Sequence, residues 1–188
     1  MIAPGAGRDP EGRKRAIIDA AAGVVADVGV GRATHRAIAA RAGVPLGATT
    51  YYFPTLRDLV VAALEEVAGA ARAELDTWAR ELAGAEDIPK ALAELAHGYV
   101  ADRPRAVVEC ELYLAAARDP ALGPYARIWI DGLSVLLSRF TTTDAAAALA
   151  ALLDGAIIQA LVTGDDLDTR RLAPAIESLV NGSAVRRA

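Results

Sequence analysis

Apolar residues recur at the spacing of an α-helix through nearly every long segment of this chain, and no other feature restricts its fold as much. Within residues 12–28 the apolar positions are Ala16, Ile17, Ala20, Ala21, Val24, Val25 and Val28. A second stripe follows Pro54 and comprises Val60, Leu64, Val67, Ala71, Leu75, Trp78 and Leu82. Runs of β-branched or aromatic residues bounded by turn residues, which sheets prefer, are scarce. We therefore predict an all-α protein.

Glycine, proline and N-capping residues divide the chain into nine predicted helices. Gly29 and Gly31 end the first helix. Thr34 can cap the second, and Gly43 can end it because glycine readily adopts the left-handed conformation of a sharp turn. The predicted helices cover residues 12–28, 34–43, 45–52, 55–83, 87–100, 104–118, 125–140, 144–162 and 170–180. Pro174 should kink the last helix or define where it begins.

The order and length of these helices indicate two domains behind a short tail. Residues 1–10 are expected to form a flexible N-terminal tail. Residues 11–54 are predicted to form a three-helix head, in which two short helices joined by a glycine-bearing turn make a helix-turn-helix. Residues 55–188 are predicted to form a six-helix body. The long helix that starts at residue 55 would join the head to the body as a rigid rod.

The cysteine and histidine content excludes several classes of protein. The one cysteine cannot form an internal disulfide, and the first fifteen residues lack the apolar core of a secretory signal. We therefore expect a cytoplasmic protein. The two histidines, His35 and His97, belong to no cluster of cysteines and histidines, so neither a metal nor another cofactor is expected.

Charge is unevenly distributed along the chain. Residues 1–58 contain eight Lys or Arg and five Asp or Glu, a net charge of +3. Because the whole chain has a net charge of -4, the remaining residues carry -7. A basic head on an acidic body favours a nucleic-acid contact at one end of the protein, although scattered solvated charges would give the same totals.

The most informative stretch, THRAIAARAGVPLGATTYYFPTLRDL, covers residues 34–59. It resembles the DNA-binding head of the tetracycline-repressor (TetR) family of bacterial regulators. The matching residues are Thr34, Ile38, Ala39, Ala42, Gly43, Val44, Gly47, Tyr51, Tyr52, Phe53 and Leu59. The specific resemblance spans residues 13–60, and for the rest of the chain it depends on the number, length and order of the helices. It implies a head that binds double-stranded operator DNA and a body that binds a small-molecule effector.

A recognition helix must present side chains to a major groove about 12 Å wide while its other side packs on the head. Ile38, Val44 and Phe53 can supply that packing. The amide groups at a helix N-terminus favour a phosphate, and an arginine can donate two hydrogen bonds to a guanine edge. The predicted DNA-binding residues are Thr34, Arg36, Pro45, Leu46, Gly47, Ala48, Thr49, Thr50, Tyr51 and Tyr52.

Three residues depart from the family pattern in the head. Thr50 stands where the family often has a tyrosine, and Leu56 stands where a lysine commonly reaches a phosphate. Leu46 replaces a residue that is frequently polar or basic. Each lost phosphate contact lowers the salt dependence of binding by about one unit of slope. We therefore expect DNA binding with fewer contacts to the DNA backbone.

The helices at 125–140 and 144–162 are predicted to form a homodimer interface. The second is apolar or small on nearly all sides, so it must be covered on all sides, and six body helices can hardly do that. Asp154 and Gln159 would be costly to place in the hydrocarbon of a membrane, so we predict that this helix is buried against protein. No membrane partner is expected. As in TetR-like proteins, a four-helix contact about a two-fold axis would provide the cover. A core made within one subunit is the alternative.

The helix over 104–117 combines apolar faces with Glu109, Cys110, Glu111 and Tyr113, which indicates a ligand site near the interior. The predicted ligand-binding residues are Trp78, His97, Glu111, Tyr113 and Trp129. Each has a structural alternative, because Trp78 lies on a core stripe and the two glutamates could pair with arginines. For Cys110, with no neighbouring His, Lys or Cys, a buried inert thiol is the expectation rather than a redox sensor.

These patterns and the resemblance predict a ligand-responsive transcriptional regulator. We expect a repressor that a small molecule releases from a palindromic operator, with an activator as the alternative, since polarity depends on where the operator lies. A constitutive DNA-binding protein with a fully packed body is one alternative. A helical enzyme using Glu109, Glu111 and His97 as acid and base is another. The sequence has no nucleophile and base at the spacing of a known catalytic motif, and it has no glycine-rich phosphate-binding loop. We therefore do not expect catalysis.

Overall fold

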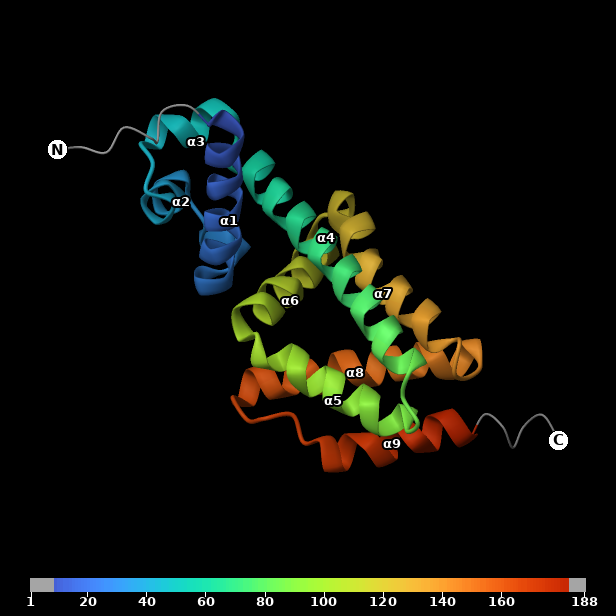
Figure 1. The fold of residues 1–188 in the computed structure, drawn as a ribbon. Coiled ribbons are helices and arrows are strands. Elements are labelled where there is room, and N and C mark those ends of the chain that lie inside the picture. Colours follow the sequence, from blue (N-terminus) through green and yellow to red (C-terminus); the bar gives the residue numbers. More distant parts are fainter. Residues whose placement is uncertain (1–8, 183–188) are drawn as a thin grey trace. The chain divides into compact units, whose positions relative to one another are not determined.

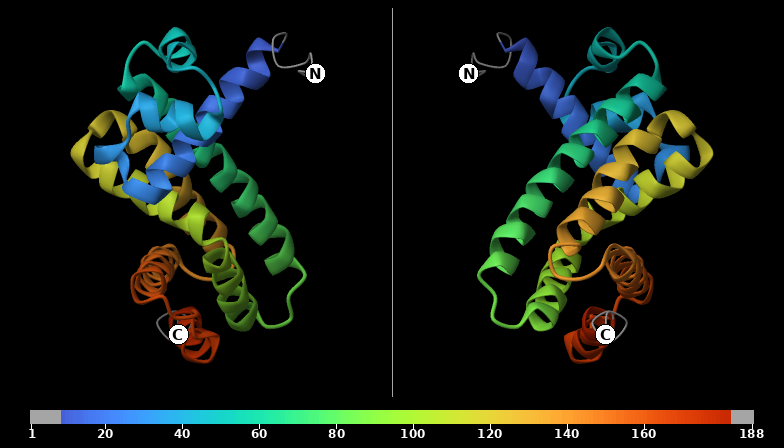
Figure 2. Two further views of the ribbon diagram at one scale, coloured as in Figure 1. Left: turned by 90° about the vertical axis from the view of Figure 1, so that its left-hand side faces the viewer. Right: turned by 90° about the vertical axis from the view of Figure 1, so that its right-hand side faces the viewer.

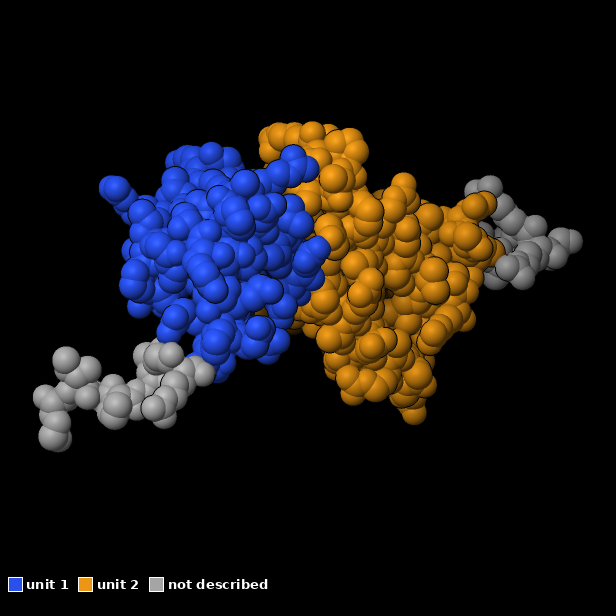
Figure 3. Space-filling view, turned by 90° about the horizontal axis from the view of Figure 1, so that it is seen from above, with its two compact units in different colours: residues 1–67 blue, residues 68–188 orange. Residues whose placement is uncertain are grey.

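The structure is a computed structural model that describes residues 9–182. In that part of the chain it contains nine α-helices, two short 3-10 helices and no strand (Figure 1). The all-α prediction is therefore confirmed. The chain divides into two compact units, residues 1–67 and 68–188, which are coloured separately in Figure 3.

The first unit contains α1 (Pro10–Val28), α2 (His35–Ala42), α3 (Leu46–Tyr52) and the start of α4 (Leu56–Ala83). A 3-10 turn, Val30–Arg32, follows α1. Of the tail expected over residues 1–10, residues 1–8 lie outside the described residues. Asp9 caps α1 by accepting a hydrogen bond from the Gly12 amide at 2.8 Å, and Pro10 begins the helix. Proline suits this position because the first amides of a helix have no internal partner.

The turn between α2 and α3 has the local geometry that its residues predict. The Thr34 hydroxyl accepts a hydrogen bond from the Ala37 amide at 3.1 Å and so caps α2. Gly43 ends α2 in the left-handed conformation, at φ 66°. A side chain with a Cβ would be strained there. The Val44 amide then donates to the Ala39 carbonyl at 3.0 Å, which fixes the direction in which the chain enters α3.

The start of α4 has a reciprocal cap that the sequence reading overlooked. The Thr55 hydroxyl accepts from the Asp58 amide at 3.1 Å, while the Asp58 carboxylate accepts from the Thr55 amide at 3.3 Å. These are the two bonds of a capping box. The helix runs for 28 residues, or about 42 Å at 1.5 Å per residue. It begins in the first unit and ends in the second.

The second unit adds α5 (Ile88–Ala101), α6 (Arg103–Arg118), α7 (Gly123–Leu137), α8 (Thr143–Thr163) and α9 (Thr169–Gly182). A 3-10 turn, Pro120–Leu122, precedes α7. Within this unit α5 packs against α8 and α9, and α7 packs against α6 and α8 (Figures 1 and 2). Pro174 lies inside α9 and does not define where that helix begins.

Helix α8 is the one described helix long and apolar enough to cross a membrane, with a mean hydropathy of 2.0 over 18 residues. A core helix of a globular protein meets the same criterion, and one such helix is weak evidence for a span. Leu149, Leu153 and Ile157 of α8 are buried in the core of the second unit. Only 44% of the apolar window is buried, so α8 also presents apolar side chains outward.

Candidate DNA-binding and ligand-binding sites

The head carries its predicted DNA-binding residues on α2, α3 and the turn between them. Most are exposed, and the exposed ones are Thr34, Arg36, Pro45, Leu46, Gly47, Thr50 and Tyr51. Ala48 and Tyr52 are partly buried. The side chain of Tyr51 is the most prominent, at 81% exposed, and its ring meets that of Tyr52 edge to face at 5.2 Å. The helix-turn-helix thus presents a face of hydroxyl, aromatic and arginine side chains.

Thr49 is the exception among these residues, because its side chain is fully buried. Its hydroxyl donates to the Leu46 carbonyl at 2.8 Å and lies 3.2 Å from Nδ1 of His35. The expectation that Thr49 offers its hydroxyl to DNA is therefore corrected, since the side chain joins α3 to the start of α2. The neighbouring hydroxyl of Thr50 stays exposed, with a bond of 3.2 Å to the Gly47 carbonyl.

In the second unit, three aromatic rings from three helices form one cluster. Trp78 on α4 is fully buried, and Tyr99 on α5 and Trp129 on α7 are nearly so. The Tyr99 and Trp129 rings stack with centroids 5.1 Å apart. The Trp78 ring meets both edge to face, at 5.4 Å from Trp129 and 6.2 Å from Tyr99. Such contacts add to the stability that burial of the rings provides.

A chain of charged groups connects this cluster to α4 and α6. Arg105 donates from Nε to the Glu109 carboxylate at 3.1 Å and from a terminal nitrogen to the Glu74 carboxylate at 2.9 Å. Glu74 also accepts from Nε1 of Trp78 at 2.9 Å, and the Tyr99 hydroxyl donates to Glu109. The Arg105 guanidinium lies 5.1 Å from the centre of the Tyr99 ring. The one guanidinium therefore balances two carboxylates and contacts an aromatic ring.

Trp129 also contacts a second carboxylate, that of Asp154, which is separate from the Arg105 ion pairs. Nε1 of Trp129 donates to the Asp154 carboxylate of α8 at 3.1 Å. The Tyr113 hydroxyl is buried beside the Asp154 carboxylate, and its interaction with that carboxylate opposes the rise in the pKa of Asp154. Asp154, Trp129 and Tyr113 border a small cavity of about 20 Å³, enough for about one water molecule. Its other lining residues are Tyr99, Glu109, Cys110, Ile157 and Ile158.

The enclosure of these groups shifts their protonation. Burial raises the pKa of Glu109 despite the hydrogen bond from Tyr99 and the charge of Arg105. Burial also raises the pKa of Asp154, and the Trp129 hydrogen bond opposes that shift. The pKa of the Cys110 thiol is raised to about 11, chiefly by burial. Cys110 is therefore a protonated thiol at neutral pH and a poor nucleophile.

The structure brings together three of the five predicted ligand-binding residues. Trp78 and Trp129 belong to the aromatic cluster, and Tyr113 lines the cavity. His97 is exposed and bonds through Nδ1 to the Leu167 carbonyl at 3.1 Å, in a separate surface hollow. Glu111 is partly buried and does not line the cavity. The structure thus places neither His97 nor Glu111 at the cavity, because their helix faces point elsewhere.

Tyr99, Asp154 and the Arg105–Glu74 pair were not among the predicted residues. Of the two glutamates on α6, Glu111 was predicted, whereas Glu109 lines the cavity. Glu109 is only 7% exposed. It lies three residues after Ala106 and three before Leu112, both buried, so it shares their face of the helix. Asp154 similarly falls between the buried residues Ala150 and Ile157 of α8. Helical periodicity applied to the charged residues was the signal that could have found both.

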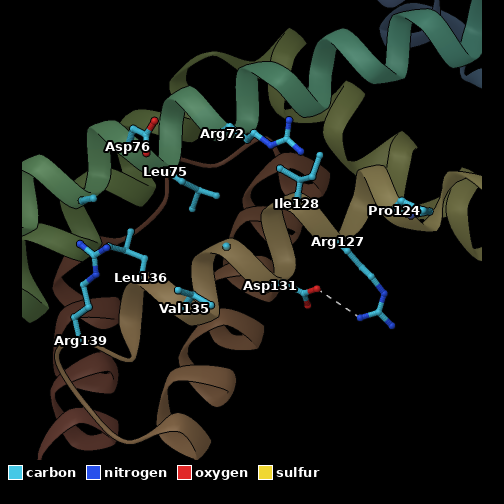
Figure 4. Close-up of a pocket in the computed structure, with 12 residues that line it drawn as sticks. Arg72, Leu75, Asp76, Pro124, Arg127, Ile128, Asp131, Val135, Leu136 and Arg139 are labelled. Carbon is cyan, nitrogen blue, oxygen red and sulfur yellow. Dashed lines mark ion pairs between the residues drawn. The ribbon is translucent and has the colours of Figure 1, made fainter.

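A wider surface groove runs between α4 and α7, with a volume of about 530 Å³ (Figure 4). The Gly132 position lies so close to α4 that an added Cβ would meet Leu75 at 2.5 Å. Charged side chains border the groove and are Arg72, Asp76, Arg127, Asp131 and Arg139. In Figure 4 Arg127 and Asp131 face one another, and their ion pair measures 3.6 Å. None of the predicted ligand-binding residues lines this groove.

No group of three or more His, Cys, Asp or Glu side chains within residues 9–182 is arranged to hold a metal ion. The carboxylates around the aromatic cluster instead accept hydrogen bonds from an arginine, a tyrosine and two indoles. Such an arrangement provides hydrogen-bond and charge recognition inside an aromatic wall.

Comparison with known proteins covers both units. Residues 17–63 match the family model described as bacterial regulatory proteins, tetR family, and residues 83–182 match the model described as tetracyclin repressor-like, C-terminal domain. A search of curated proteins gave no match.

Solved structures give the same result. The multidrug binding protein EbrR complexed with imidazole is 41% identical, with a TM-score of 0.75 over 91% of this chain and 96% of that one. EbrR complexed with malachite green is 39% identical, with a TM-score of 0.74 over 89% and 97% of the two chains. A TetR-family member from Streptomyces coelicolor A3 is 40% identical, with a TM-score of 0.78 over 89% and 97%. With its helix-turn-helix head, the chain belongs to the TetR family of bacterial transcriptional regulators.

Proposed function

We propose that this regulator is a homodimeric repressor that a small molecule releases from a near-palindromic operator. In this proposal residues 11–54 form the DNA-binding domain, and residues 55–188 form the effector-binding and dimerisation domain. The protein acts in the cytoplasm, where its operator DNA lies. It binds no membrane and catalyses no reaction.

The exposed face of the helix-turn-helix supports DNA recognition by the head. Tyr51, Thr50 and Leu46 project from α3, the helix that would enter the major groove. Arg36 is exposed on α2, where it can reach a guanine edge or a phosphate. Two heads related by two-fold symmetry would require half-sites about 34 Å apart, or a multiple of that distance.

Exposed apolar side chains on α7 and α8 support the homodimer. Ile130 and Val135 of α7 are 40% and 64% exposed, and Ile158 and Val162 of α8 are 41% and 80% exposed. Large apolar residues that gather on neighbouring helices are typical of a protein–protein interface. A partner subunit would cover these residues, as a closed two-fold dimer requires.

The observation that carries ligand response is the charged link between the internal cavity and α4. Glu109, a cavity residue, pairs with Arg105, which pairs in turn with Glu74 on α4. Because α4 continues without a break from residue 56 to residue 83, a shift at Glu74 can be transmitted along the helix toward the head. EbrR, the similar multidrug binding protein, is solved in complexes with ethidium, proflavin and malachite green. A small molecule that binds better to the shifted state would weaken operator binding.

Selection of DNA fragments tests operator recognition. The purified protein is incubated with a fragment library of the source genome at one stated salt concentration, and bound fragments are sequenced. Enrichment of one near-palindromic sequence is the expected result. Uniform recovery of fragments would contradict specific recognition, because non-specific binding depends on phosphate contacts alone.

Light scattering tests the dimer. The wild-type protein at micromolar concentration should have twice the mass of the 19.5 kDa chain. Val162→Asp places a charge in the proposed interface and should give a monomer that loses operator affinity. Leu114→Asp is the matched control, since Leu114 of α6 is 51% exposed and lies outside the proposed interface. A monomeric wild type, or equal effects of the two substitutions, would contradict the proposal.

A constitutive DNA-binding protein remains the second candidate. Its body would be a fully packed core, and the cavity of about 20 Å³ is small enough to be compatible with one. The two candidates differ in one result. A constitutive regulator keeps its operator affinity in the presence of every compound that binds its body.

A further inference from the structure

Asp154 differs from the other carboxylates of the second unit's interior because no cation balances it. Glu74 and Glu109 share the Arg105 guanidinium at 2.9 and 3.1 Å. Asp154 is partly buried, and the two groups that act on its carboxylate, Nε1 of Trp129 and the Tyr113 hydroxyl, are neutral. It forms no ion pair with any described residue. A carboxylate partly removed from water without a cation lowers the stability of the folded protein. The residue is therefore poorly explained by the stability of the ligand-free body.

The surroundings of Asp154 are aromatic. Trp129 contacts it directly, and Tyr113 and Tyr99 line the same cavity. The faces of such rings attract cations, and the protein already uses this attraction where the Arg105 guanidinium lies 5.1 Å from the centre of Tyr99. A carboxylate beside aromatic rings matches a ligand that is both positively charged and aromatic. The buried hydroxyl of Tyr113, beside Asp154, adds one polar group that a ligand can contact.

We infer that Asp154 is the anionic anchor of a site for an aromatic monocation, whose ring packs against Trp129 and Tyr113. This inference rests on the proposed function and specifies the class of effector. Glu109 does not serve as the anchor, since Arg105 already occupies its carboxylate. The geometry therefore selects one positive charge rather than two.

The site must open to receive such a ligand. Its present volume of about 20 Å³ is far below the roughly 300 Å³ or more of small-molecule pockets. Helix α6 contributes Glu109, Cys110 and Tyr113 to the lining, while α7 and α8 contribute Trp129 and Asp154. Separation of α6 from α7 and α8 would enlarge the cavity and move Arg105, which lies one turn before Glu109. Ligand entry is thus tied to the Arg105–Glu74 pair.

Binding of two dyes with one ring skeleton tests the inference. Ethidium carries a permanently charged phenanthridinium, whereas phenanthridine is its uncharged parent at pH 8. Quenching of tryptophan fluorescence reports binding locally, because the chain has two tryptophans and both belong to the aromatic cluster. The full-length protein is used without DNA, so intercalation does not contribute. We expect ethidium to bind at least about tenfold more tightly than phenanthridine.

Two substitutions locate the charge that causes this preference. Asp154→Asn keeps an oxygen acceptor for Trp129 and removes the charge, and should weaken ethidium binding by about tenfold or more while leaving phenanthridine binding within about twofold. Asp131→Asn is the matched control, since Asp131 is an exposed carboxylate bordering the α4–α7 groove. It should leave both affinities unchanged. Circular dichroism of each variant establishes that it is folded.

Three results would overturn the inference. They are equal affinity of the wild-type protein for the two dyes, unchanged ethidium binding by folded Asp154→Asn, and a loss of ethidium binding in Asp131→Asn instead. The first result needs no variant, so the inference can be refuted even if Asp154→Asn does not fold. If the dye-binding prediction fails, the tests of operator selection and of the dimer mass are not affected. Conversely, a protein that selects no operator can still show the predicted dye preference.

Discussion

The head and the body place their functional groups in opposite environments. On the head, most of the side chains proposed to bind DNA are exposed, and they come from 19 consecutive residues, Thr34 to Tyr52. In the body, the polar groups are enclosed and come from α4, α5, α6, α7 and α8. A substitution on the head should therefore change binding more than stability. A substitution in the body cluster should change stability as well as binding, since its groups support one another.

The strongest test of this contrast is Trp129→Ala. Trp129 is 5% exposed and contacts Trp78 and Tyr99, so its truncation leaves a large cavity. The free energy of unfolding should fall by about 3–5 kcal/mol. Urea unfolding followed by circular dichroism measures the change, with Tyr51→Ala as the exposed aromatic control. A loss below about 1 kcal/mol would mean that the aromatic cluster contributes little to the body's stability.

A smaller effect is expected from two adjacent threonines on α3. Thr49→Val removes a buried hydroxyl that donates to the Leu46 carbonyl and lies beside His35. The free energy of unfolding should therefore fall by about 1–2 kcal/mol. Thr50→Val alters an exposed hydroxyl and should change stability by no more than about 0.5 kcal/mol. Thermal unfolding of both variants checks the pair. Equal losses would show that the inward and outward positions on α3 are wrongly assigned.

Tyr51→Ala tests whether the exposed face of α3 contributes to operator affinity. Its side chain is 81% exposed and makes one ring contact, to Tyr52, so the folded head should tolerate its loss. Operator affinity should fall about tenfold, which corresponds to about 1.4 kcal/mol. Fluorescence anisotropy with a labelled operator at fixed salt measures the effect. Unchanged operator affinity would remove Tyr51 from the proposed contact face.

The smallest expected effect is a gain in stability on Asp154→Asn without ligand. Burial raises the pKa of Asp154 in the folded state above its unfolded value. The folded protein therefore loses stability as the pH rises through the folded pKa, and this cost is absent below the unfolded pKa of about 3.9. The variant should be about 1 kcal/mol more stable at pH 7, and the difference should disappear toward pH 4. Melting curves at several pH values measure this difference. A variant that is less stable than the wild type at pH 7 would contradict the predicted gain in stability.

The same contrast explains how far the sequence could predict the molecule. The head was predictable because its signals are local. Thr34 caps the start of α2, and Gly43 ends the same helix in the left-handed conformation. The nine α-helices of residues 9–182 were predicted in the right order, since each has its own apolar stripe or cap. The boundaries differ by one to three residues, mostly at helix ends where capping decides the last turn.

The body site was harder to predict because it depends on which helix faces meet. Trp78, Trp129 and Tyr113 were chosen for their chemistry and do lie together. Tyr99 carries no local signal that separates it from an ordinary core tyrosine. Arg105 and Glu74 are 31 residues apart, and only the packing of α6 near α4 makes them a pair. The inward turn of Thr49 likewise depends on His35, which lies on the preceding helix.

The central claim is that an aromatic cation in the body weakens DNA binding by the head. Its most direct test is the anisotropy of the labelled operator complex, titrated with malachite green at fixed salt, for the wild-type protein and for Asp154→Asn. The account predicts that the dye lowers wild-type operator affinity by about fivefold or more, and leaves that of Asp154→Asn unchanged. Unchanged affinity of the wild type at saturating dye, or an equal loss for both proteins, would contradict it.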